Sequence, residues 1–108
     1  MLYGTGDKVP ELGNKLNYIF GLATGNAHNI QRSMTMASQL SRIGIYDNAV
    51  GRDIITQALT QVLNNPSSIA KIQNNGYVVR EALLVGPGGF LKMQTVWDGV
   101  KLITVNLF

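Results

Sequence analysis

Apolar residues recur at helical spacing in the first part of the chain. Leu12, Leu16 and Ile19 repeat every three to four residues, which predicts an amphipathic helix. Pro10 can occupy its first turn, where a missing N–H costs nothing. The pattern predicts a helix from Pro10 to about Leu22.

A second helix is predicted over residues 27–43, and its two faces differ in character. Asn26 is suited to cap its start, and Gly44 can end it in the left-handed conformation. At about 100° per residue, polar side chains fall on one stripe and apolar side chains lie opposite, where we expect them to face inward. The polar stripe comprises His28, Arg32, Thr35, Gln39 and Arg42, and the apolar face comprises Ile30, Met34, Ala37 and Leu40.

A third helix is predicted to begin at Asp47 or Asn48, and the polar run 64–68 ends it. A short segment through residues 69–72 then leads to an Asn-Asn-Gly turn signal at 74–76. The buried edge of this helix comprises Ile55, Leu59, Val62 and Leu63.

After residue 76 the period of the pattern changes to two. Three strands are predicted, over residues 77–85, 90–96 and 100–107, joined as hairpins. The Gly-Pro-Gly-Gly run at 86–89 is interpreted as a hairpin loop, because it lacks the Lys-Ser/Thr and the strand-to-helix context of a phosphate cradle. Helices followed by an antiparallel meander predict an α+β domain, with the helices packed on one face of a small sheet.

The register of the last hairpin follows from keeping one face apolar. A three-residue loop, with Gly99 left-handed at its end, pairs Lys92 with Thr104 and Met93 with Ile103. A two-residue loop mixes polar and apolar side chains on each face, so we prefer the longer loop. It turns Leu91, Met93, Ile103, Val105 and Leu107 inward, and Lys92, Gln94, Thr104 and Asn106 outward.

Length and composition fit one globular domain. The chain has 108 residues, 45% of them hydrophobic, and a net charge of +3 that mildly favours a polyanionic partner. We interpret residues 1–9 as a leader or linker remnant and residues 10–108 as the domain. No apolar run is long enough to span a bilayer. There is no cysteine, one histidine and only scattered acids, so no metal site or other cofactor is predicted.

Four segments together resemble a known family. They read GNAHNIQRS at 25–33, IGIYD at 43–47, REALLVGPGG at 80–89 and KMQTVWDG at 92–99. In this order they resemble the C-terminal toxin domains of contact-dependent growth inhibition proteins and filamentous haemagglutinin-like exoproteins. The order of helices and then sheet is also similar to that of the barnase, colicin and RelE group of small ribonucleases.

The resemblance implies a toxin carried at the tail of a large secreted or cell-surface exoprotein. Such a domain is delivered to the cytoplasm of a neighbouring bacterium and is blocked by a cognate immunity protein. The ribonuclease group places its active site on the sheet and often cuts transfer RNA. The resemblance therefore implies a metal-independent RNA endonuclease, although a single histidine departs from a mechanism with two histidines.

RNA cleavage by the substrate's own 2′-hydroxyl needs a titratable group and one or two cations. Histidine as a residue type has a reference pKa near operating pH; His28 is the one histidine, and Arg32 follows one turn later on the same stripe. Lys92 and Thr104, facing each other across the hairpin, could clamp a phosphate. The alternative is that His28 is a surface or capping residue and that the sheet face is simply solvated.

Arg80 and Glu81 are adjacent on one predicted strand, so they point to opposite faces and only one can join Lys92. Arg80 as a transition-state cation and Glu81 as a base are therefore alternatives. Trp97 could stack on an unpaired base or, as a lone tryptophan beside a turn, could cover the edge of the core. The predicted RNA-binding side chains are Arg32, Arg42, Gln94 and Trp97.

Two other functions are compatible with the sequence. A non-enzymatic binding module could block a target by occupying it in a stoichiometric complex. DNA cleavage is less favoured, because no metal-coordinating acidic cluster is visible.

Overall fold

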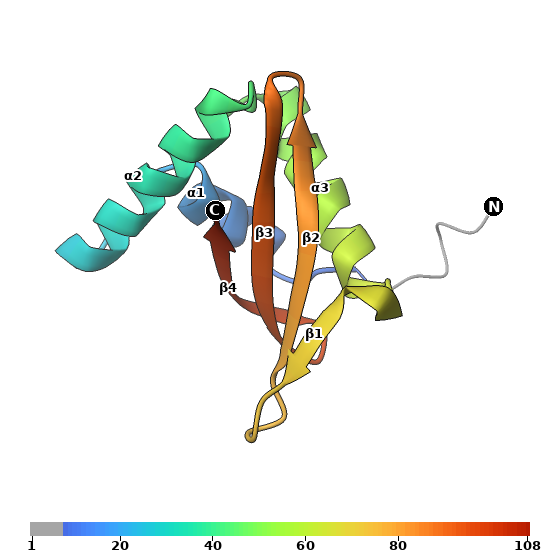
Figure 1. Ribbon diagram of the computed structural model, residues 1–108. Helices are drawn as coiled ribbons and strands as arrows, with labels where there is room; N and C mark the ends of the chain where they lie inside the picture. The colour runs from blue at the N-terminus through green and yellow to red at the C-terminus, as the bar shows by residue number, and fades with distance from the viewer. Residues whose placement is uncertain (1–7) are drawn as a thin grey trace.

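The computed structural model describes residues 8–108, in which three helices precede a four-stranded antiparallel sheet (Figure 1). This is the α+β class that the sequence predicts. The strands lie in the order β1-β2-β3-β4, so each strand pairs with its neighbour in the chain. The elements are α1 (Leu12–Ile19), α2 (Ala27–Arg42), α3 (Ala49–Leu63), a 3₁₀ turn (Pro66–Ser68), β1 (Ile69–Ile72), β2 (Val78–Gly86), β3 (Gly89–Asp98) and β4 (Lys101–Leu107).

One face of the sheet carries the core, and the opposite face is open. In Figure 1, α1 and α3 lie behind the sheet and α2 lies beside β4. Leu40, Ile55 and Leu59 of the helices are almost fully buried, as are Leu84 and Trp97 of the sheet. We call the other side, which faces away from this core, the outer face.

Local signals set the helix ends as predicted at most positions. The side chains of Asn26 and Asn48 accept hydrogen bonds from backbone N–H groups in the first turns of α2 and α3. Gly44 follows α2 with a φ of +80°. Helix α1 is shorter than predicted, because Glu11 already has a left-handed backbone and Gly21, with φ +87°, turns the chain after the helix.

The buried side of α2 differs from the prediction. Ser33, Met36 and Leu40 are buried, whereas Met34 is 57% exposed. The reason is that α2 packs between α1 and β4, so part of the predicted polar stripe faces the sheet. Gln39 of that stripe donates a hydrogen bond to the carbonyl oxygen of Leu107.

The segment 69–72, predicted only as a connection, forms strand β1. Its partners across the antiparallel pair with β2 are Ile69 with Arg80 and Ile72 with Val78. A register shift follows Ile69, and all four residues of β1 are exposed. Because this strand is short and buries none of its side chains, the hydrophobic pattern gave no sign of it.

The predicted register of the last hairpin is wrong. Asp98 pairs with Lys101 across a two-residue loop, and Ile103 is an extra residue at a bulge, so Thr104 pairs with Val96. Lys92 instead exchanges backbone hydrogen bonds with Phe108. A regular ladder after a two-residue loop would mix polar and apolar side chains on each face. The bulge avoids this, because Leu102 and Val105 both face inward, on either side of Ile103 and Thr104.

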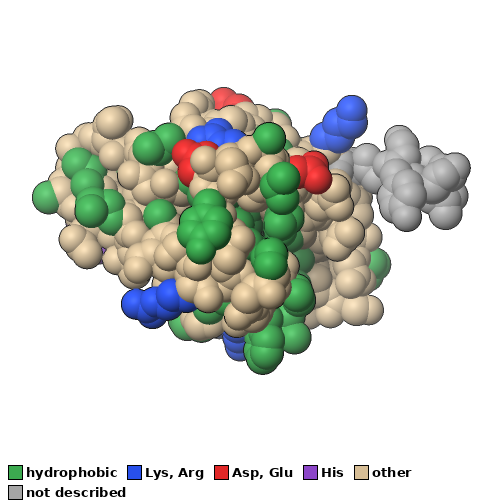
Figure 2. Space-filling model, turned by 90° about the horizontal axis from the view of Figure 1, so that it is seen from above, with side chains coloured by type: hydrophobic (Ala, Val, Ile, Leu, Met, Phe, Trp, Pro, Cys, Tyr) green, Lys and Arg blue, Asp and Glu red, His purple; other side chains and the backbone are tan. Residues whose placement is uncertain are grey.

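The 86–89 run is a hairpin loop, as predicted. Gly86 pairs with Gly89, and the N–H of Gly88 donates to the carbonyl oxygen of Ile43 just beyond α2. Hydrophobic side chains of the outer face are exposed near this end of the sheet: Leu83, Val85 and Phe90. Figure 2, which looks down on this end of the molecule, shows several exposed hydrophobic side chains there.

The predicted leader falls mostly outside the described part of the chain. Residues 1–7 are outside the described residues, and Val9 is buried in the core, so the folded domain includes Val9. Within residues 8–108, none of the helices has the length and apolarity that crossing a bilayer requires.

Candidate nucleic-acid interface

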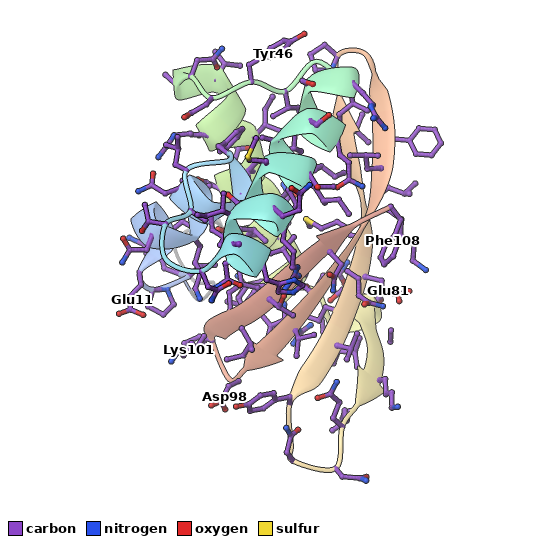
Figure 3. The ribbon with its side chains drawn as sticks, turned by 90° about the vertical axis from the view of Figure 1, so that its left-hand side faces the viewer. Glu11, Tyr46, Glu81, Asp98, Lys101 and Phe108 are labelled. Atoms are coloured by element: carbon purple, nitrogen blue, oxygen red, sulfur yellow. The ribbon has the colours of Figure 1, made fainter. Side chains whose placement is uncertain are left out.

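A row of polar side chains crosses the outer face of the sheet. Glu81 pairs with Gln94, and Gln94 pairs in turn with Asn106, so these three side chains lie side by side on one face. Gln94 Nε2 donates to Glu81 Oε2 at 3.0 Å, and Lys92 Nζ lies 3.4 Å from Glu81 Oε1. Figure 3 shows Glu81 on the side of the sheet that faces away from the helices. Of Arg80 and Glu81, it is therefore Glu81 that joins Lys92.

Helix α2 contributes a cation to this row. Arg32 Nη2 donates to Asn106 Oδ1 at 3.2 Å and contacts Thr104 Oγ1 at 3.4 Å. Arg32 is half-buried, and it connects the start of α2 with strand β4. We call the set Arg32, Thr104, Asn106, Gln94, Glu81 and Lys92 the outer-face row.

The carboxylate of the row is held in its ionised form. The hydrogen bond from Gln94 lowers the pKa of Glu81 most, partial burial raises it, and the ammonium of Lys92 lowers it further. The net effect is a pKa below the ordinary value for glutamate. Glu81 therefore carries a full negative charge at neutral pH, beside the positive charge of Lys92.

His28 lies on the first turn of α2 and is exposed. It lines a groove of about 250 Å³ between α2 and β4, together with Arg32, Gln39 and Asn106. Thus the structure brings His28 to the same groove as one end of the outer-face row. Lys92 lies on β3, about 4.8 Å across from β4, and its partner there is Phe108, two residues along the chain from Asn106 and four from Thr104.

The side chain of Arg80 makes hydrogen bonds within the fold that join β2 to the end of α3. Its Nη1 donates to the carbonyl oxygens of Val62 (3.3 Å) and Asn65 (3.1 Å) and to Ser68 Oγ (2.9 Å). These acceptors lie at and just after the end of α3, on the side of the sheet opposite Lys92. A cation at a helix C-terminus is also favoured by the helix dipole. The structure therefore does not bring Arg80 to the outer-face row.

Trp97 cannot stack on RNA in this structure. Its side chain has no exposed surface, and its Nε1 donates to Thr95 Oγ1 at 2.7 Å. Thr95 is equally buried, because it alternates along β3 with the outward-facing Gln94. Of the two readings of Trp97 that the sequence left open, the structure supports the one in which it covers the core.

Arg42 remains exposed, in the last turn of α2. It is ten residues from Arg32, which corresponds to about 15 Å along the helix axis. It is therefore not part of the outer-face row.

The sequence analysis missed a second concave region, next to the first. A pocket of about 330 Å³ lies between α1, the start of α2 and β4, and Lys15, Tyr18, Asn29, Arg32 and Thr104 provide its polar lining. Lys15 and Tyr18 are three residues apart on α1 and so share a helix face. That spacing was a visible signal, but nothing in the sequence placed this face beside Arg32.

Within residues 8–108, no three His, Asp or Glu side chains gather in a way that could hold a metal ion.

Comparison with solved structures shows a likeness of fold to a known protein. No protein-family model matches the chain, and no curated protein matches it. A contact-dependent growth inhibition toxin–immunity protein complex from Klebsiella pneumoniae 342 contains a chain with a TM-score of 0.73 and 24% sequence identity. The match covers 97% of this chain and 95% of that chain. The similarity of fold thus extends over nearly the whole of both chains, and it agrees with the resemblance to contact-dependent growth inhibition proteins.

Proposed function

We propose that this chain is the toxin domain of a contact-dependent growth inhibition protein and that it cleaves RNA. Its substrate would be transfer RNA, as the family resemblance implies, and a cognate immunity protein would neutralise it. The domain would reach the cytoplasm of a neighbouring bacterium as the tail of an exoprotein. The similarity to a chain of a toxin–immunity complex supports the toxin assignment.

The observation that carries the ribonuclease assignment is the contact of Arg32 with Thr104 and Asn106. It brings the start of α2, with the protein's single histidine, to an open sheet face that also bears Lys92. A cation, hydroxyl and amide donors, and a group that titrates near neutrality are what phosphodiester cleavage requires.

In the proposed reaction, the 2′-hydroxyl of the substrate attacks the adjacent phosphorus. A base takes the 2′-hydroxyl proton while the O2′–P bond forms and the P–O5′ bond breaks. An acid protonates the leaving 5′-oxygen, so the products are a 2′,3′-cyclic phosphate and a 5′-hydroxyl. In this proposal His28 serves as acid or base, and Arg32 and Thr104 hold the phosphoryl oxygens.

The other end of the outer-face row has a different role in this proposal. Glu81, with its lowered pKa, is a weak proton acceptor at neutral pH and holds Lys92 and Gln94 in place. Lys92 would then bind a neighbouring phosphate of the same RNA. A direct role for Glu81 as the base is the alternative, and the pH dependence of Glu81→Gln cleavage separates the two.

The test uses the purified chain and total bacterial RNA, with and without a chelator. We expect discrete cleavage that the chelator does not change, and sequencing of the new 5′ ends identifies the RNA and the position. His28→Ala should lower the cleavage rate by about 10²-fold or more. Because His28 is exposed, this variant should fold normally, and Ser38→Ala, exposed on the same helix, is the matched control.

The outcomes are distinct. Full cleavage by His28→Ala would remove this residue from the mechanism while leaving the ribonuclease assignment intact. Intact RNA, together with a stoichiometric complex between the chain and a bacterial target, would establish the non-enzymatic binding module instead.

A further inference from the structure

The pocket between α1, α2 and β4 shares Arg32 and Thr104 with the reaction proposed above, but its residues Lys15 and Tyr18 have no role there. Its volume of about 330 Å³ is at the lower end of the range that holds small ligands. Two cations, Lys15 and Arg32, line it, and no acidic side chain is among its lining residues in the described part of the chain. Its charge therefore favours an anionic ligand.

The pocket is held open by features of the backbone. The bulge at Ile103 adds a residue to β4, and Ile103 forms part of the wall. Ser33 Oγ of α2 donates to the carbonyl oxygen of Tyr18 and accepts from the N–H of Ala23, which fixes the end of α1 against α2. This contact is buried, so the positions of Lys15 and Tyr18 relative to Arg32 are set by the core.

The pocket is also continuous with the proposed site. Arg32 and Val105 line both the pocket and the groove that contains His28. A chain of nucleotides bound at His28 and Arg32 would therefore enter the pocket as it passes over Arg32.

We propose that this pocket binds the nucleotide next to the scissile phosphate of a single-stranded RNA. Its phosphate lies between Lys15 and Arg32, and its base lies against the ring of Tyr18, as unpaired bases stack on aromatic side chains in other RNA-binding proteins. The inference rests on the proposed ribonuclease function, because it assigns a further subsite to the same substrate.

Lys15→Gln tests the phosphate contact. With a six-nucleotide single-stranded RNA as substrate, we expect KM to rise about threefold to tenfold with kcat little changed, because the lost contact is present in both ground and transition states. The slope of log affinity against log salt should fall by about one. Lys101→Gln, which replaces an exposed cation at the start of β4, is the matched control and should change neither quantity.

Tyr18→Leu tests the stacking contact while it keeps an apolar side chain against the core. We expect affinity for the six-nucleotide RNA to fall about fivefold or more. Tyr18→Phe should retain the affinity, since the ring remains. Thermal unfolding of both variants confirms that the fold is intact before binding is compared.

Binding of the six-nucleotide RNA to the wild-type chain is also measured by fluorescence anisotropy, so that the ribonuclease proposal and the subsite proposal are tested separately. If RNA is cleaved but Lys15→Gln leaves KM and the salt slope unchanged, the subsite is wrong and the ribonuclease stands. If no RNA is cleaved but binding of the oligonucleotide depends on Lys15, the ribonuclease is wrong and the pocket is a nucleotide site. If adenosine monophosphate competes as well as the six-nucleotide RNA, the pocket is a site for free nucleotides. If Lys15→Gln loses affinity only for the immunity protein, the pocket is a protein contact. Either result overturns the proposal.

Discussion

Replacing Arg80 with methionine would remove the hydrogen bonds that join β2 to the end of α3. The guanidinium Nη1 contacts three oxygen atoms, at 2.9, 3.1 and 3.3 Å, and it has two hydrogens to share among them. Methionine has a similar length but donates no hydrogen bond. The variant therefore removes the donors and leaves most of the packing.

The size of the effect follows from the number of bonds. A hydrogen bond from a charged donor contributes about 1.5–3 kcal/mol, and two such bonds would give roughly 3–6 kcal/mol. Arg80 is only half-buried, and the Val62 carbonyl keeps a hydrogen bond from Ser68 Oγ, so the lower part of the range applies. We expect the free energy of unfolding to fall by about 2–4 kcal/mol, which would lower Tm by roughly 10–25 °C.

Urea unfolding followed by the fluorescence of Trp97, the only tryptophan, measures this change directly. Arg42→Met removes an exposed arginine and should leave the midpoint nearly unchanged. Below the transition, folded Arg80→Met protein should cleave RNA at close to the wild-type rate. Wild-type stability combined with lost cleavage would refute this reasoning and return Arg80 to the role of a catalytic cation.

Two further predictions concern backbone spacing and pH. Gly51→Ala should lower the free energy of unfolding by about 3 kcal/mol or more, because a Cβ there would lie 1.8 Å from the carbonyl oxygen of Tyr46. Gly13→Ala is the control: a Cβ at Gly13 would meet no atom within 4 Å, so the free energy of unfolding should stay the same or rise by up to about 1 kcal/mol. Equal urea midpoints for the two variants would contradict that close approach. The lowered pKa of Glu81 means that its contribution to stability is complete above its unfolded pKa of about 4.3 and is lost as pH falls through the lower folded value. The stability difference between the wild type and Glu81→Gln should therefore shrink on acidification, and a pH-independent difference would argue against the Gln94 and Lys92 contacts.

Local signals in the sequence were sufficient for the ends of α2 and the start of α3, and for the hairpin between β2 and β3. Asn26 and Asn48 cap helices, and Gly44 ends one, because each effect depends only on a side chain and the few backbone groups next to it. The alternation of β2 and β3 likewise placed Thr95 inward and separated Arg80 from Glu81. Predictions of this kind need no knowledge of what lies across the molecule.

The register of β4 could not be obtained in the same way. The prediction placed the turn at residues 97–99 and assumed a regular ladder, whereas the chain turns at Gly99 and Val100 and places an extra residue, Ile103, inside the strand. Both solutions keep one face apolar, so the hydrophobic pattern could not distinguish them. The consequence for the site is direct, because the later turn and the bulge together move Thr104 from Lys92 to Val96 and bring Asn106 opposite Gln94.

The position of α2 explains why the sequence predicted only part of the site. A polar stripe on a helix is ordinarily the solvent side, and on that assumption Met34 was expected to be buried. In the structure the stripe lies against β4, and Arg32 and Gln39 make hydrogen bonds with that strand. Arg32 donates hydrogen bonds to a threonine and an asparagine, and among the described residues it has no carboxylate as a partner. Its positive charge is therefore not compensated. That uncompensated charge, set between two concave regions, is the feature that a phosphate would neutralise.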